Sequence, residues 1–118
     1  MNIEQLRSYC INKKGVEECL PFGPDTLVFK VMGKVFLLCG LENNPIAFNA
    51  KCDPERAIAL REKYASVQPG YHMNKTHWNT ISADGELSLK QLQELIDHSY
   101  DLVAASLSKA QKAELSNL

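Results

Sequence analysis

The sequence lacks the features that mark membrane-spanning, exported and metal-stapled proteins. No apolar run approaches the roughly 20 residues that span a bilayer, and the N-terminus shows no basic-then-apolar signal layout. The four cysteines form no C-x-x-C pair and no Cys/His spacing of a zinc finger. We therefore expect a cytoplasmic chain with no membrane contact, no cofactor and four free thiols, which are Cys10, Cys19, Cys39 and Cys52.

A surplus of either charge is also missing. The formal net charge is -1, whereas a protein that grips nucleic acid without regard to sequence is expected to be basic. The distribution is uneven, because residues 27–81 carry seven basic and four acidic side chains and both flanks are net acidic. The middle of the chain is therefore the part that an anionic partner would contact.

Catalytic patterns are equally scarce. No glycine-rich phosphate loop precedes a helix, and no serine or cysteine is identifiably paired with a base. His72 and His77 have no Asp, Glu or Cys beside them to complete a metal site, so we expect no bound metal. A small enzyme that uses His72, Lys75 and His77 for proton transfer and anion binding stays an alternative, but we expect no enzyme.

The length and the patterning predict one domain over residues 1–118. Helix caps predict helices that begin after Asn2, Asp53 and Ser88. Apolar and β-branched runs predict strands at residues 27–31, 35–39, 46–51 and 78–82, with a short extended piece at 71–73. A glycine at the tight turn between the first two strands predicts that they form a hairpin. Residues 109–118 lose the apolar pattern and are expected to fray.

This order of elements predicts an α+β fold. Hairpin connections favour antiparallel pairing, and helices must cover an apolar sheet face. We therefore expect a two-layer domain, with a sheet of roughly five antiparallel strands and helices packed on one face. Within it, Cys10 and Cys39 lie in apolar patterns and are expected to be buried as small hydrophobic residues.

Residues 69–81 contain more side chains that could bind or react than any other segment, including two of the three histidines and the only tryptophan. We call this stretch the signature segment. It is more polar than a core strand requires, and a buried polar group without a partner costs about 1–3 kcal/mol. We therefore predict a ligand-facing surface, with Trp78 as a structural residue at its base.

The signature segment also carries a resemblance. Pro-Gly-Tyr-His-Met-Asn-Lys, followed by His-Trp-Asn-Thr, resembles the characteristic segment of the MmcQ/YjbR-like family of small bacterial proteins. Further blocks extend the resemblance over nearly the whole chain: Pro21-Phe22-Gly23, Gly33-Lys34, Asp53-Pro54-Glu55, Leu60-Arg61 and Ser99-Tyr100. The resemblance implies a two-layer fold similar to frataxin and type III secretion chaperones, and DNA binding through a double wing of β-hairpins.

Two functions follow as hypotheses. The first is DNA binding, in which cations at hairpin tips neutralise phosphates and an exposed aromatic ring stacks on a base. Its candidate residues are Lys34, Arg61, Tyr71, His72, Asn74, Lys75, His77 and Trp78. The alternative is a chaperone-like module that binds a protein or peptide, because a sheet face edged by aromatic residues is a common docking surface.

Overall fold

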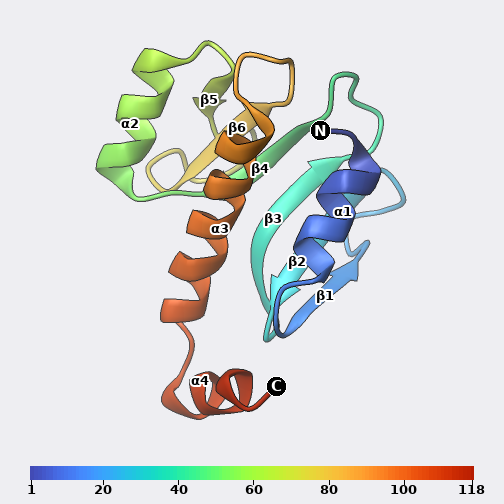
Figure 1. Ribbon diagram of the computed structural model, residues 1–118, viewed down its shortest axis with the longest axis vertical. Coiled ribbons are helices and arrows are strands. Elements are labelled where there is room, and N and C mark those ends of the chain that lie inside the picture. The colour runs from blue at the N-terminus through green and yellow to red at the C-terminus, as the bar shows by residue number, and fades with distance from the viewer.

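The computed structural model describes all residues 1–118, which form four helices and six strands (Figure 1). The helices are α1 (Ile3–Ile11), α2 (Pro54–Lys63), α3 (Leu89–Ala105) and α4 (Lys109–Ser116). The strands are β1 (Val16–Cys19), β2 (Thr26–Val31), β3 (Lys34–Gly40), β4 (Ala47–Lys51), β5 (Val67–Pro69) and β6 (Trp78–Ser82). None of the helices combines the length and the apolar composition that crossing a membrane requires.

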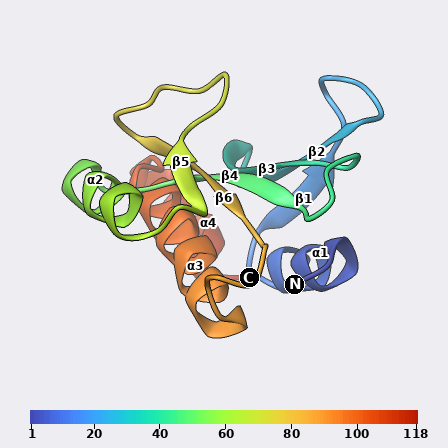
Figure 2. The same ribbon diagram turned by 90° about the horizontal axis from the view of Figure 1, so that it is seen from above.

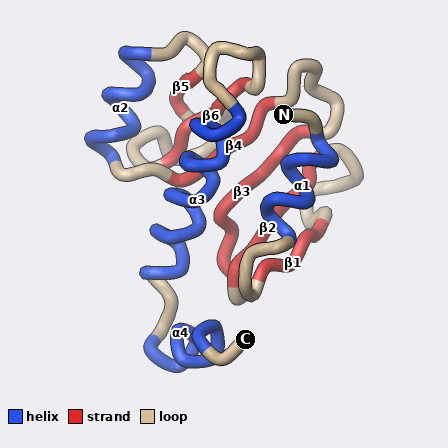
Figure 3. The backbone as a smooth tube through the Cα atoms, viewed as in Figure 1, coloured by secondary structure: helices blue, strands red, loops and turns tan.

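All six strands belong to one antiparallel sheet with the order β1-β2-β3-β4-β6-β5 (Figure 3). The first four strands follow one another as neighbours. β6 then pairs with β4, and the short β5 pairs with the outer side of β6. The predicted α+β class and the antiparallel sheet are confirmed, with one strand more than expected.

The helices and the core lie on one face of the sheet, as Figure 2 shows for α1 and α3. Alternate residues of the strands point toward them, because successive side chains of a strand lie on opposite faces. Leu27, Phe29 and Val31 of β2 are buried in this core. α1 and α3 contribute the buried side chains Leu6, Cys10, Leu92, Leu95, Ile96 and Val103. The predicted burial of Cys10 and Cys39 is confirmed, and all four cysteines are free.

Two local predictions were wrong, and one strand was not predicted. β1 was not predicted, because its sequence Val-Glu-Glu-Cys is half acidic; as an edge strand it keeps Glu17 exposed, and Arg7 pairs with Glu18. Residues 71–73 form a turn rather than an extended piece, and the strand lies just before them at Val67–Pro69. Residues 109–116 form α4 rather than fraying, because Ser108 caps the helix and Leu115 packs against the core.

The predicted β2–β3 hairpin is confirmed. Val31 pairs with Lys34, so the loop holds only Met32 and Gly33. Both loop residues have positive φ angles, 49° and 84°, which is the geometry that a two-residue hairpin loop needs to match the strand twist.

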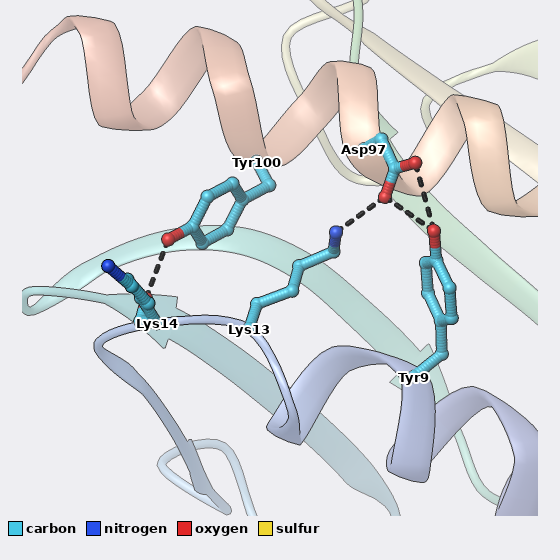
Figure 4. Close-up of polar contacts among 5 residues, drawn as sticks. All are labelled: Tyr9, Lys13, Lys14, Asp97 and Tyr100. Atoms are coloured by element: carbon cyan, nitrogen blue, oxygen red, sulfur yellow. Dashed lines mark hydrogen bonds and ion pairs between the residues drawn. The ribbon is translucent and has the colours of Figure 1, made fainter. Parts of the chain in front are cut away.

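Polar contacts fasten α1 and the turn that follows it to α3 (Figure 4). The Tyr9 hydroxyl donates to the Asp97 carboxylate at 2.7 Å, and the Lys13 ammonium donates to the same carboxylate at 2.5 Å. Burial and the hydrogen bond to Asp97 raise the pKa of Tyr9 to about 12. The Tyr100 hydroxyl donates to the Lys14 carbonyl at 2.6 Å. These contacts set the position of α1 against the long helix.

A buried serine fastens α3 to the sheet. β3 contains a bulge, because Phe29 pairs with Leu37 but Lys30 pairs with Val35, which leaves Phe36 as the extra residue. The hydroxyl of Ser99 donates to the Phe36 carbonyl at 2.5 Å and accepts from the Lys51 amide at 2.8 Å. One hydroxyl thus satisfies a carbonyl of β3 and an amide at the end of β4.

His98 makes stability depend on pH. Its Nε2 accepts from the Asp53 amide at 3.0 Å, which requires a neutral ring. Burial first, and then the nearby Arg56, lower the pKa of His98. Since the pKa is lower in the folded state, the unfolded chain takes up the proton first as the pH falls. We expect the free energy of unfolding to be constant above the unfolded pKa of about 6.5 and to decrease below it, down to the folded pKa.

Chemical denaturation from pH 8 to pH 5 measures this dependence. These two pH values lie about 1.5 pH units above and below the unfolded pKa. In His98→Gln, the free energy of unfolding should change less with pH over that range. His77→Gln is the matched control, because the His77 side chain is exposed. An unchanged slope in His98→Gln would contradict the assignment.

Candidate functional site

No helix covers the other face of the sheet, which we call the open face. Its residues follow from the strand register. The central row crosses all six strands and consists of Cys19, Val28, Leu38, Asn49, Thr80 and Gln68. A row on one side of it contains Lys30, Val35, Lys51 and Trp78, and a row on the other side contains Thr26, Gly40, Ala47 and Ser82.

Two loops rise on this side of the sheet (Figure 2). We call residues 20–25, between β1 and β2, the first wing, and residues 70–77, between β5 and β6, the second wing. A groove of about 590 Å³ is lined by both wings and the open face. Its lining residues are Phe22, Thr26, Val35, Leu38, Cys39, Gly40, Asn43, Ala47, Asn49, Tyr71, His72, Met73, Trp78 and Thr80. None of them is Asp, Glu, Lys or Arg.

Large apolar side chains stand exposed around the groove. Phe22 on the first wing is 71% exposed, and Tyr71 on the second wing is 70% exposed. Leu20, also on the first wing, and Leu41, in the loop after β3, are exposed as well. Exposed apolar groups that gather around a hollow mark binding sites rather than ordinary surface. A second hollow, of about 450 Å³ along α1, is lined mainly by polar residues.

Hydrogen bonds from two backbone amides join the start of the second wing to β6. The Gly70 amide donates to the Trp78 carbonyl at 2.9 Å, and the Tyr71 amide donates to Thr80 Oγ1 at 2.9 Å. Gly70 is required there, because a Cβ on it would lie 2.9 Å from both Trp78 Cβ and Trp78 O. The wing thus meets β6 at a distance that only glycine allows.

Polar side chains of the signature segment form hydrogen bonds within the second wing. Asn74 Oδ1 accepts from the amides of Thr76 and His77 at 2.9 and 3.3 Å. The Lys75 ammonium donates to the Gly70 carbonyl at 2.9 Å. The segment is therefore polar largely because its own turn uses these groups, which sequence composition alone could not distinguish from ligand contacts.

Arg61 of α2 supports the wing from the helix side. Its Nε donates to Asn79 Oδ1 at 2.6 Å, and its Nη2 donates to the Lys75 carbonyl. Asn79 is 1% exposed, and its Nδ2 donates to the Ala57 carbonyl at 3.4 Å. Arg61 and Asn79 form one network that joins α2, β6 and the second wing.

The structure separates the predicted basic residues. Lys34 lies at the β2–β3 turn and donates to the Ser106 carbonyl at 3.0 Å, at the C-terminal end of α3. This contact places Lys34 with the helix layer, whereas Lys75 is in the second wing and Arg61 lies behind it. The predicted cations therefore do not form one patch.

The aromatic residues lie together instead. Tyr71 and His72 have ring centroids 4.0 Å apart, and His72 holds this position with a φ of 57°. Trp78 is half-buried and lines the groove, so it belongs to the open face rather than to the core under the helices. His77 and Asn74 are exposed and lie outside the groove lining.

Sequence reasoning assigned no binding role to the first wing and did not find the floor of the groove. Leu38, Asn49 and Thr80 come from three strands and are brought together by register. The period-2 pattern shows which residues of one strand share a face. Placing these three residues side by side also requires the pairing of the strands. Phe22 was predicted to lie in a loop and to belong to a family block, but not to bind a ligand.

Comparisons with known proteins agree over nearly the whole chain. The family YjbR matches residues 11–102. The chain is 34% identical over 115 residues to the uncharacterized protein YjbR of Escherichia coli strain K12, which covers 98% of this chain and 97% of that protein. It is 42% identical over 94 residues to the uncharacterized protein YbdF of Escherichia coli O157:H7, covering 80% of this chain and 77% of that protein.

Solved structures share the fold. A Deinococcus radiodurans protein with a DUF419 domain superposes with a TM-score of 0.91 at 38% identity, over 98% of this chain and 88% of that one. A Pseudomonas syringae protein superposes with a TM-score of 0.75 at 30% identity, over 86% of this chain and 98% of that one. The chain belongs to the YjbR family.

Proposed function

We propose that this protein is a binding module that captures an extended peptide segment of a partner protein in the groove between its wings. The observation that carries the proposal is the lining of the groove, which has aromatic rings on both walls and no Asp, Glu, Lys or Arg. An anionic polymer would need cations there, whereas apolar side chains of a peptide would not. A volume of about 590 Å³ admits several such side chains.

The polar groups in the groove favour a peptide over a purely apolar ligand. Asn49 Nδ2 makes one long hydrogen bond, at 3.4 Å to the Tyr71 carbonyl, so its second N–H is free. Asn43 also lines the groove and makes no side-chain hydrogen bond within the protein. Asn49 Oδ1 already accepts from the Thr80 hydroxyl, so Asn49 offers a donor, whereas Asn43 offers both a donor and an acceptor; these match the carbonyl and N–H of a peptide backbone.

DNA binding through the wings is the second candidate. It is favoured by the two wings rising on the same side of the sheet (Figure 2) and by Lys30 and Lys51 on the open face. The wings themselves offer little to a phosphate, because the first wing carries no Lys or Arg and Lys75 is held by the Gly70 carbonyl. The peptide proposal is therefore the better supported of the two.

Selection from a phage library of random peptides of about 12 residues tests the proposal. The wild type is the target, and the double variant Phe22→Ser/Tyr71→Ser is the counter-target. We expect enriched peptides to carry aromatic and aliphatic side chains and to bind with a Kd on the order of 10 μM. Loss of two aromatic anchors should weaken binding roughly thirtyfold. Enriched peptides without tryptophan should shift the emission of Trp78, the only tryptophan.

Two controls make the result specific. Ile58→Ser removes another exposed apolar side chain, on α2, and should leave peptide binding unchanged. Thermal unfolding should be nearly unchanged in all of these variants, because the replaced side chains are exposed. Failure to enrich any peptide, or equal binding by the double variant, would contradict the proposal. Tight binding of a DNA duplex at low salt that Lys30→Ala/Lys51→Ala abolishes would favour DNA.

A further inference from the structure

This inference rests on the proposed function and names the class of peptide that the groove takes. We propose that the peptide is a proline-rich segment in the polyproline II conformation. Such a segment presents flat rings and free backbone carbonyls, and its prolines have no N–H. Two features of the groove match it: the rings in its walls, and the balance of free hydrogen-bond donors and acceptors beside them.

Aromatic rings line the groove from both wings and from its floor. Phe22 belongs to the first wing, Tyr71 and His72 belong to the second, and Trp78 begins β6. The rings of Tyr71 and His72 lie side by side, with centroids 4.0 Å apart. Grooves lined with aromatic rings dock proline-rich segments, because these segments are already ordered before they bind. The walls of the groove therefore suit proline rings.

Free hydrogen-bond donors lie beside these rings. The indole Nε1 of Trp78 has no partner in the protein, and it is open to solvent, because no buried side-chain nitrogen or oxygen lacks a partner. Asn49 Nδ2 makes a single bond, to the Tyr71 carbonyl, and keeps one free N–H. An indole N–H and an amide N–H can each donate to a peptide carbonyl. This part of the groove therefore offers donors to a ligand.

The acceptors near these donors already bind groups of the protein. Asn49 Oδ1 accepts from the Thr80 hydroxyl, and Thr80 Oγ1 accepts in turn from the Tyr71 amide at 2.9 Å. The Tyr71 carbonyl accepts from Asn49, and the Gly70 carbonyl accepts from the Lys75 ammonium. A peptide with an N–H on every residue would bury some of these groups without a partner, which is costly. Proline has no N–H to bury.

Free acceptors remain on the other side of the groove. Thr26 pairs with Gly40 in the row across the central row from Trp78. The Asn43 side chain lies over Gly40, because a Cβ on that glycine would be 2.8 Å from Asn43 Nδ2. The side chains of Thr26 and Asn43 can accept from an ordinary residue. The expected segment therefore has prolines over Trp78 and a non-proline residue beside Asn43.

Three synthetic peptides test the inference by isothermal titration calorimetry. The first is acetyl-Ala-Phe-Pro-Pro-Leu-Pro-Pro-Ala-amide. The second has alanine at every proline position, and the third has N-methylalanine there, which removes the N–H without adding a ring. The proline peptide should bind about tenfold tighter than the alanine peptide, because two prolines in contact with the groove lose less chain entropy. The N-methylalanine peptide should fall between them, because it also has no N–H to bury at these positions.

Trp78 gives a specific readout, because it is the only tryptophan. Its indole N–H gives one peak in a proton–nitrogen correlation spectrum, and this peak should move downfield when the N–H donates to a carbonyl of the proline peptide. Trp78→Phe keeps a ring and removes the N–H, so it should weaken the proline peptide about fivefold. Tyr64→Phe is the matched control, because the Tyr64 hydroxyl accepts from Gln91 of α3 and does not line the groove.

The outcomes separate the inference from the proposed function. Equal Kd values for the proline and alanine peptides would overturn the inference and leave the proposed function standing, because an ordinary extended peptide would then fill the groove. An indole peak that stays in place while the proline peptide binds would also overturn it. If none of the three peptides binds, the inference is wrong, and the phage selection decides the proposed function separately: enriched peptides without proline would support that function, and failure to enrich any peptide would contradict it.

Discussion

Replacing Ser99 with alanine is expected to lower the free energy of unfolding by about 2–4 kcal/mol. The hydroxyl is fully buried and serves two backbone groups, the Phe36 carbonyl and the Lys51 amide. The carbonyl belongs to the bulged residue of β3, so the regular ladder offers it no replacement. Alanine leaves both groups buried without a partner, and the cost of each adds to the other.

Denaturation by urea measures the loss, with Ser106→Ala as the matched control. Ser106 caps the C-terminal end of α3, and its hydroxyl donates to the Val103 carbonyl at 2.6 Å. The Val103 carbonyl can accept a hydrogen bond from another donor, so Ser106→Ala should lower the free energy of unfolding by less than about 1 kcal/mol. Similar losses in Ser99→Ala and Ser106→Ala would show that Ser99 does not join the sheet to α3 as described.

Replacing Asn79 with alanine is expected to cost about 2–4 kcal/mol and to loosen the second wing. Asn79 accepts from Arg61 Nε at 2.6 Å and donates to the Ala57 carbonyl. Without it, the half-buried guanidinium loses its side-chain partner, and the arginine also contacts the wing through the Lys75 carbonyl. The emission of Trp78 should move to longer wavelength as the neighbouring wing admits water.

Asn79→Asp separates the two hydrogen bonds. Aspartate keeps an acceptor for Arg61 and loses the donor to Ala57, so its cost at neutral pH should be less than half that of alanine. Amide hydrogen exchange of Gly70 and Tyr71 reports on the wing, because both amides donate to β6. Unchanged protection of these amides in Asn79→Ala would contradict the role of the Arg61–Asn79 network.

Peptide binding and fold stability can be separated in this protein. The residues proposed to contact a peptide, Phe22 and Tyr71, are exposed, whereas Ser99 and Asn79 are buried and hold the framework. Several blocks of the family resemblance have framework roles in the structure: Arg61 supports the second wing, Ser99 joins α3 to the sheet, and Tyr100 bonds to Lys14. Part of what makes the family recognisable is therefore structural.

The starts of α1, α2 and α3 could be predicted from sequence because their causes are local. Asn2 with Gln5, and Ser88 with Gln91, form capping boxes within four consecutive residues, and Asp53 caps α2. The β2–β3 hairpin is equally local, since its turn depends on Met32 and Gly33. β1 has a tertiary cause, because it is a strand only where β2 offers it an edge. α4 begins with a capping box of Ser108 and Gln111, which is as local as the others, but its sequence has no apolar pattern to predict a helix; contacts from Leu115 and a hydrogen bond from Gln111 to the Met32 carbonyl support it.

The sequence by itself determined the fold class, the starts of α1, α2 and α3 and the burial of Cys10 and Cys39, because composition, periodicity and caps act between near neighbours. Only the tertiary structure decided what the polar residues do. Lys34 meets Ser106, and Arg61 meets Asn79, across many intervening residues. The groove arises in the same way, since strand register brings together side chains whose distance in the sequence carries no sign of their contact.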